Sequence, residues 1–191
     1  ERTMCTFLGI AGKISEKDVD EGLVKKSEVT FLEGYLWDEG DPKKAFDKAI
    51  KNSNKVAMSL SDLFCVERHK KEFIKLVKNR LDIVFANEQE ILSLIDGSSI
   101  EDAINFSKEI DKNIIITRGA EGAIAIKNKE IFECNAKNNL NIVDLTGAGD
   151  LFAAGYLHGI INNLSIEKAL DYGTNLSSKV IQQIGARIKN N

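Results

Sequence analysis

The stretch NIVDLTGAGDLFAAGYLHGII, residues 141–161, carries the strongest signal in the sequence. Its first residues predict a short strand, the middle predicts a tight glycine-rich turn, and the remainder predicts an apolar helix. A strand that passes through a glycine turn into a helix is typical of an α/β domain. We therefore expect an α/β fold with a ligand site at this turn.

Small residues open the helix that follows the turn. At Gly147, Ala148 and Gly149 no bulky side chain stands between the backbone and a ligand. The first amides of a helix have no partner within it and lie at the positive end of its dipole. This arrangement suits the charge on a phosphoryl group during its transfer. Asp150, in the same turn, is predicted to be the base that accepts the proton of an attacking hydroxyl.

A simpler interpretation of the same residues stays open on spacing alone. Gly147, Ala148 and Gly149 can merely permit a tight turn between strand and helix, and Asp150 can merely compensate the helix dipole. Since helix starts with small residues are common, the pattern by itself does not choose between the two.

The residues before this stretch predict the sheet. DIVFA at 82–86 and NIIIT at 113–117 are apolar throughout, as strands covered on both faces are. GAIAIKNKEIFECNA at 122–136 predicts a hairpin that turns at Asn128 and Lys129. We predict a doubly wound, mostly parallel sheet flanked by helices on both faces, with an antiparallel hairpin at one edge.

Further strands and helices alternate along the chain and form a single predicted domain over residues 1–191. The remaining predicted strands are 2–11, 29–37 and 55–61. The remaining predicted helices are 15–27, a helix that opens at Pro42 and runs to 53, 68–81, 87–95, 99–110 and one or two helices within 165–184.

Composition excludes several classes of protein. In 191 residues, 26 Lys and Arg against 29 Asp and Glu leave a net charge of −3, which gives no basic footprint for nucleic acid. The cysteines Cys5, Cys65 and Cys134 lack the spacing of a zinc or redox motif, and His69 and His158 lack partners at metal-ligand spacing. No apolar run reaches the roughly 18–20 residues that span a bilayer, so we expect a soluble cytoplasmic protein without a membrane partner.

DLTGAGDLFAAGYLHG, residues 144–159, resembles the C-terminal signature of the ribokinase-like, or pfkB, carbohydrate and nucleoside kinases. That signature, D[TL]xGAGDxF, precedes a helix of small residues, and the resemblance extends over essentially the whole chain. It implies phosphoryl transfer from ATP with Mg²⁺, with Asp150 as base and residues 147–149 as the anion hole. Leu145 departs from the threonine that many members carry.

The resemblance gives roles to two further groups of residues. Asn87 and Glu90 match the NxxE motif, which implies that they arrange Mg²⁺ and the phosphates through water. The same pair is also the pattern of a helix capping box. Asp144 matches a residue that holds a monovalent cation, K⁺, in several relatives.

The nucleotide itself is implied to contact two other segments. Thr117, Arg118, Gly119 and Gly122 match the segment beneath the triphosphate, and a guanidinium at a strand end suits phosphate. Asn175 corresponds to a position on the adenine side. The glycines can also be plain turn residues, Arg118 a solvated arginine and Asn175 a helix-surface amide.

The acceptor is the least specified part of the prediction. The residues from 59 to 90 look closest to adenosine kinases, in which the residue matching Phe64 packs against the base, although a core phenylalanine is the alternative. The family's N-terminal strands, its Gly-Gly substrate motif and most of its lid, through which relatives often form homodimers, have no counterpart in this sequence. We therefore expect a kinase for a primary hydroxyl of a nucleoside or a sugar, adenosine first and a ribose or fructose type second.

Two other classes of protein fit the sequence less well than a kinase. A pseudokinase that senses nucleotide or sugar would not need Asp150 together with the glycine turn and the NxxE pair. A dinucleotide-dependent oxidoreductase would need an early GxGxxG after a strand, which the sequence lacks.

Overall fold

The computed structural model describes residues 5, 7–37 and 41–189. Part of the strand predicted over residues 2–11 lies outside the described residues. In the described part, residues 5 and 7–11 form no strand, and a 3₁₀ helix occupies Ala11–Lys13. Phe7 is 93% exposed, since no neighbouring strand covers it. The prediction of a strand is therefore wrong for these residues.

The chain forms two compact units that meet in sequence between Val84 and Phe85. Its strands form one six-stranded sheet in the order β1-β2-β3-β4-β5-β6. The strands are β1 (Thr30–Glu33), β2 (Val56–Ser59), β3 (Ile83–Asn87), β4 (Asn113–Thr117), β5 (Ala123–Lys127) and β6 (Glu130–Cys134). The sheet is mostly parallel, with antiparallel strands at the β6 edge, and helices flank it, as the sequence predicts.

The first unit holds β1 and β2 as a parallel pair, with Thr30 opposite Val56. Its helices are α1 (Glu21–Lys26), α2 (Pro42–Asn52) and α3 (Leu63–Asn79), together with 3₁₀ turns at Glu16–Asp18 and Gly34–Trp37. Helix α2 opens at Pro42 as predicted. Helix α3 begins five residues earlier than predicted, because Asp62 accepts the backbone amide of Cys65 at 2.6 Å and caps the helix there.

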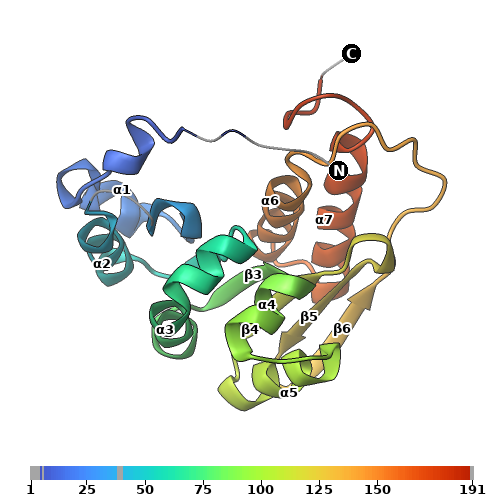
Figure 1. Ribbon diagram of the computed structural model, residues 1–191, viewed down its shortest axis with the longest axis horizontal. Coiled ribbons are helices and arrows are strands. Elements are labelled where there is room, and N and C mark those ends of the chain that lie inside the picture. The colour runs from blue at the N-terminus through green and yellow to red at the C-terminus, as the bar shows by residue number, and fades with distance from the viewer. Residues whose placement is uncertain (1–4, 6, 38–40, 190–191) are drawn as a thin grey trace. The chain divides into compact units, whose positions relative to one another are not determined.

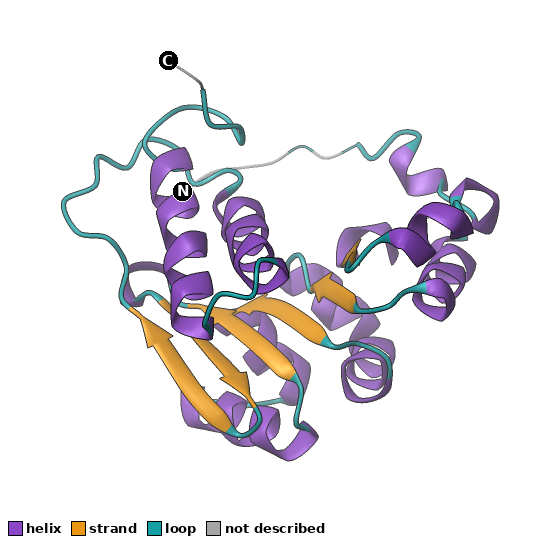
Figure 2. Ribbon diagram, turned by 180° about the vertical axis from the view of Figure 1, so that it is seen from behind, coloured by secondary structure: helices purple, strands orange, loops and turns teal. Residues whose placement is uncertain are grey.

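The second unit carries helices on both faces of its strands (Figures 1 and 2). They are α4 (Glu88–Ile95), α5 (Ile100–Ile110), α6 (Ala148–Ile161) and α7 (Ile166–Val180). In both views, α4 and α5 lie on one face of these strands, and α6 and α7 lie on the other. Ile114, Ile115 and Ile116 of β4 are completely buried, as the double cover requires.

Buried Tyr156 fixes α6 on the strands. Its ring meets Phe85 of β3 edge to face at 5.6 Å, and its hydroxyl donates to Asn113 Oδ1 at 3.1 Å. Burial raises the pKa of Tyr156 to about 12, so the hydroxyl stays protonated and keeps this hydrogen bond near neutral pH. The helix that follows the glycine turn is therefore held firmly to the sheet.

The predicted hairpin is confirmed. Asn128 and Lys129 form its two-residue turn with φ of 52° and 64°, and β5 pairs with β6 so that Lys127 faces Glu130.

The short strand predicted within 141–144 is wrong. Residues 135–147 form an irregular segment, in which Ile142 is 62% exposed. The amides of Val143 and Asp144 both donate to the carbonyl of Ile181, at 2.8 and 3.2 Å, so one carbonyl beyond α7 takes the place of a partner strand. Helix α7 likewise ends at Val180, before the predicted limit of 184.

None of the helices in the described ranges combines the length and the apolar character that crossing a membrane requires.

Replacing Gly122 by alanine should destabilise the protein far more than the same change at Gly119. At Gly119 the φ of 57° gives an alanine a backbone strain of about 1–2 kcal/mol, whereas at Gly122 a φ of 88° with a ψ of −133° is a conformation that glycine alone adopts readily. Only at residue 122 would the new methyl lie 2.0 Å from the carbonyl oxygen of Cys134, whereas at Gly119 no atom lies within 4 Å. We expect Gly122→Ala to cost at least about 2 kcal/mol more in urea unfolding. Equal losses would contradict this packing.

Candidate active site

The turn from Asp144 to Asp150 leaves the start of α6 open. Gly147 caps the helix with φ of 81°, a conformation that a side chain would strain, and the amide of Leu151 donates to its carbonyl at 2.9 Å. Within the described chain, no hydrogen-bond acceptor meets the amides of Gly149 and Asp150. Two donors at the positive end of the helix are thus available to an anion.

The segment after α7 holds this turn in shape. One carboxylate oxygen of Asp144 accepts the amide of Thr146 at 2.9 Å, and the other accepts the amide of Gly185 at 2.9 Å. A methyl group at Gly147 would lie 2.8 Å from the Cα and Cβ of Ala186. The turn is therefore packed against the end of the chain on one side and open on the other.

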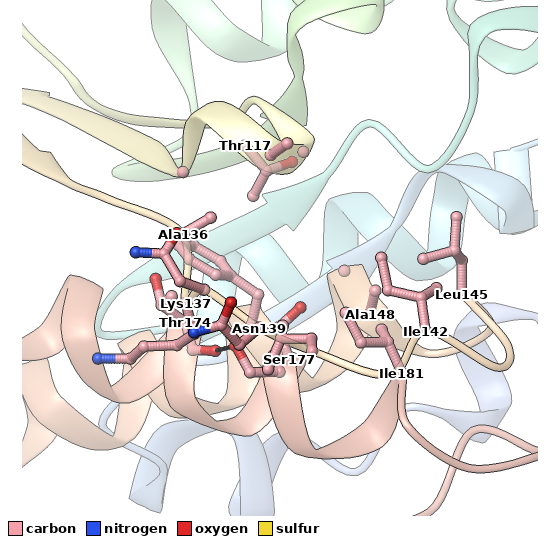
Figure 3. Close-up of a pocket in the computed structure, with 18 residues that line it drawn as sticks. Thr117, Ala136, Lys137, Asn139, Ile142, Leu145, Ala148, Thr174, Ser177 and Ile181 are labelled. Atoms are coloured by element: carbon pink, nitrogen blue, oxygen red, sulfur yellow. Dashed lines mark hydrogen bonds between the residues drawn. The ribbon is translucent and has the colours of Figure 1, made fainter.

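A cavity of about 530 Å³ lies at the open side of the turn (Figure 3). Three parts of the second unit line it: the end of β4 with the loop to β5, the irregular segment before α6 with the start of that helix, and the last two turns of α7 with Ile181. In Figure 3, Thr117 faces across the cavity toward the labelled residues of α7. Its lining is more apolar than polar, and its polar groups are hydroxyls, amides and the amine of Lys137.

The glycine turn meets this cavity directly. Ala148 and Gly149 line it, and a methyl group at Gly149 would find no atom within 4 Å. Asp150 is exposed and follows Gly149 in the first turn of α6. Gly147 lies behind them, packed against Ala186. The residues predicted to form an anion hole and a base thus lie together at an open surface.

The segment after β4 is placed partly as predicted. Thr117, Gly119 and Gly122 line the cavity. Arg118 does not line it, because its Nε donates to Glu88 Oε2 at 2.9 Å and its Nη2 pairs with Glu121. The hydrogen bond to Glu88, joined by the charge of Glu121, raises the pKa of Arg118. Phosphate binding by Arg118 stays a prediction.

Asn87 and Glu90 form a helix capping box, which was the alternative to a role in arranging Mg²⁺ and the phosphates. The amide of Glu90 donates to Asn87 Oδ1 at 2.8 Å, while Asn87 donates its backbone amide and Nδ2 to the two oxygens of Glu90 at 2.9 and 2.7 Å. Glu90 is only 5% exposed. The pair is rigid, and its part in holding Mg²⁺ stays a prediction.

Asn175 is not among the described residues that line the cavity. Its Nδ2 donates to Asp171 Oδ2 at 2.8 Å, and the other oxygen of Asp171 accepts Lys137 Nζ at 2.6 Å. The hydrogen bond to Asp171 raises the pKa of Lys137, which therefore stays charged at the cavity wall. An adenine contact by Asn175 stays a prediction.

Sequence reasoning missed the face of α7 that does line the cavity. It consists of Thr174, Ser177 and Ser178, continued by Ile181. Spacings of three, four and seven residues place these on one side of a helix. Small hydroxyl residues in the middle of an otherwise apolar helix face could have indicated that this face lines a polar site.

The wall formed by residues 136–140, with Ile142 and Leu145, was also missed. This segment has no periodic pattern, and the strand predicted within it would have turned alternate residues away from the cavity.

The whole chain, residues 1–191, matches the model of the pfkB family of carbohydrate kinases. The chain belongs to the pfkB carbohydrate kinase family.

Two curated pfkB-type relatives illustrate the similarity. A 5-dehydro-2-deoxygluconokinase of Geobacillus kaustophilus is 27% identical over 182 residues, which are 88% of this chain and 54% of the relative. An adenosine kinase of Schizosaccharomyces pombe is 25% identical, over 98% of this chain and 61% of the relative. The chain thus spans little more than half the length of these two pfkB relatives.

Solved structures agree with this membership. A probable sugar kinase from Rhizobium etli superposes with a TM-score of 0.88 at 38% identity, over 93% of this chain and 55% of the other. An adenosine kinase from Sinorhizobium meliloti gives a TM-score of 0.89 at 36% identity, over 92% and 55%. One of these proteins is described as a probable sugar kinase and the other as an adenosine kinase, so similarity alone does not single out one acceptor.

Phe64, the predicted acceptor contact in this pfkB chain, lies in the first turn of α3 and is 71% exposed. The alternative that it is a core phenylalanine is therefore wrong. A stacking role stays a prediction. In the described residues no group of three or more His, Cys, Asp or Glu side chains is arranged to hold a metal, and none of the three cysteines forms a disulfide.

Removing the carboxylate of Asp144 should loosen the glycine turn. Asp144→Ala loses both amide hydrogen bonds, and we expect a loss of about 2–4 kcal/mol in urea unfolding. Asp144→Asn keeps one carbonyl oxygen as an acceptor and should lose about half as much. Protease cleavage after residue 184 should rise in the same order, and an alanine variant as stable as the original protein would contradict the prediction.

Proposed function

We propose that the protein transfers the γ-phosphate of ATP to a primary hydroxyl of a nucleoside or sugar, with adenosine as the first choice of acceptor. One observation supports this most: the unpaired amide of Gly149 opens on a cavity large enough for a nucleotide, and the unpaired amide of Asp150 follows it in the chain. Small-molecule sites commonly measure about 300–1,000 Å³. A helix start that faces such a cavity suits a phosphate group.

The cavity supplies the donor site in this proposal. The base and ribose lie against Ile142, Leu145 and Ile181, and the hydroxyls of α7 offer them polar contacts. The phosphates extend toward Gly149, past the backbone at Gly119. Thr117 and Gly122 complete that side. Preorganised amides stabilise the transferring phosphoryl group because they need no rearrangement when its charge shifts.

Asp150 acts as the base. It follows the amide-bearing Gly149 immediately and is exposed, so an acceptor hydroxyl can reach its carboxylate. The hydroxyl proton passes to Asp150 as the oxygen attacks the γ-phosphorus, and ADP departs with the electrons of the broken bond. Ala148 and Gly147 shape the backbone around the transferred group.

Mg²⁺ fits the NxxE pair only through water. Both oxygens of Glu90 already accept hydrogen bonds from Asn87, and the carboxylate is buried. Because Mg²⁺ keeps several of its waters in such sites, its contact with the pair would run through metal-bound water. The bound ion would supply charge neutralisation between the phosphates.

K⁺ is proposed beside Asp144. Its two carboxylate oxygens, which accept the amides of Thr146 and Gly185, are the kind of hard oxygen ligand that a cation takes. A cation there would stabilise the turn through the same carboxylate.

The acceptor is proposed from the relatives and from Phe64. An adenosine kinase and a sugar kinase match the chain about equally well, so a ribose- or fructose-type sugar kinase is the second candidate. The exposed ring of Phe64 favours a planar base, since stacking on an aromatic side chain contributes roughly 1–3 kcal/mol in nucleic-acid complexes. Dimerisation through a lid stays a prediction.

Asp150→Asn should lower kcat by at least about 10²- to 10⁴-fold while ATP binding changes little, because an amide cannot accept the hydroxyl proton. ADP release with a panel of nucleosides and sugars measures turnover, and calorimetry measures ATP binding. Glu167→Gln is the matched control, since Glu167 is also an exposed carboxylate in the first turn of a helix. Turnover that survives in the Asp150 variant would remove the proposed base, and acceptor-independent, negligible ADP release by the unsubstituted protein would favour a nucleotide sensor.

Gly149→Ala should separate phosphate binding from folding. The new methyl meets no protein atom within 4 Å, and alanine favours a helix over glycine by up to about 1 kcal/mol, so the melting temperature should not fall. Because the methyl would occupy the space that the phosphate approaches in our proposal, we expect kcat/KM for ATP to fall by at least about tenfold. An unchanged kcat/KM for ATP would mean that the phosphates do not bind beside Gly149.

A further inference from the structure

An ion pair joins the ends of two neighbouring strands close to the cavity. Glu88 directly follows β3, and Arg118 directly follows β4, which lies beside β3 in the sheet. Arg118 Nε donates to Glu88 Oε2 at 2.9 Å, and the two side chains are 22% and 35% exposed. Partial shielding and a charge-assisted hydrogen bond let such a pair keep its geometry better than a fully exposed one.

Arg118, one member of the pair, belongs to a turn over residues 118–122 that is held together by its own hydrogen bonds. The amide of Arg118 donates to the carbonyl of Gly122 at 2.8 Å, and the amide of Glu121 donates to the carbonyl of Arg118 at 3.0 Å. The guanidinium also meets the carboxylate of Glu121. Residues 118–122 therefore behave as one rigid piece, whose orientation follows the side chain of Arg118. Gly119 and Gly122 of this piece line the cavity.

Glu88, the other member of the pair, belongs to helix α4. Glu88 is the first residue of that helix, and Asn87 and Glu90 fix the helix start through their reciprocal hydrogen bonds. The ion pair thus connects two segments that the proposed reaction uses, neither of which depends on the other for its internal hydrogen bonds.

We propose that Arg118 is a positioning residue: through Glu88 it holds the turn 118–122 in place as a wall of the nucleotide cavity, and it does not bind the phosphates itself. This inference rests on the proposed function, since it assumes that the cavity holds a nucleotide. Two carboxylates already neutralise the guanidinium, and the charge of Glu133 adds to theirs. A phosphate would have to displace one of them to reach it.

The variants Glu88→Gln and Arg118→Gln, alone and combined, distinguish the two roles. We expect each single change to weaken binding of a non-hydrolysable ATP analogue by about tenfold, and the double change to weaken it no further, since both break the same pair. At saturating ATP, kcat should stay within about twofold, because the residues around Asp150 are untouched. Calorimetry, steady-state kinetics and melting temperatures supply the readouts, with Glu101→Gln, an exposed glutamate on α5, as the control.

Three outcomes would overturn the inference. If Arg118→Gln weakens binding while Glu88→Gln leaves it unchanged or strengthens it, Arg118 contacts phosphate. If melting temperatures fall while analogue binding stays unchanged, the pair only stabilises the fold. If the unsubstituted protein fails to bind the analogue, the proposed function itself fails, and this result is distinct from the other two.

Discussion

The carboxylate of Asp144 sets the geometry on which the candidate site depends. It accepts one amide from the glycine turn and one from Gly185, which lies beyond α7, so it ties two distant segments together. Ala186 then packs against Gly147 so closely that no side chain fits there. With one side of the turn closed in this way, the amides of α6 can face only the other side, where the cavity lies.

The same tie explains why residues 141–144 are not a strand. The amides of Val143 and Asp144 donate to the single carbonyl of Ile181, and the amide of Asn141 donates to the side chain of Gln182, so the segment bends around the cavity. A strand would have paired its amides along a neighbour and placed alternate side chains on opposite faces. The irregular path instead brings Ile142 and Leu145 to the same cavity wall.

Local signals in the sequence were sufficient wherever a feature depends on neighbouring residues. The turn at Asn128 and Lys129, the capping box at Asn87 and the start of α2 at Pro42 each depend on residues a few positions apart. The glycine turn itself was predictable for the same reason.

Features that depend on distant partners were beyond the sequence. The segment before α6 forms no strand because the amides of Val143 and Asp144 donate to a carbonyl about forty residues away. The sequence did not indicate that Glu88 lies beside the guanidinium of Arg118. The phosphate role of Arg118 and the adenine role of Asn175, whose amide donates to Asp171 one helical turn away, stay predictions.

The residues that we propose for the ATP site and for the acceptor lie in different units of the chain. Every residue that lines the cavity lies between Thr117 and Ile181, within the second unit, and the hydrogen bonds that shape the turn lie there too. Phe64, the residue tied to the acceptor in our proposal, lies in the first unit. A substitution at Phe64 therefore disturbs none of the hydrogen bonds that form the anion site. In our proposal, acceptor preference can accordingly change at Phe64 while the hydrogen bonds of the glycine turn stay as they are.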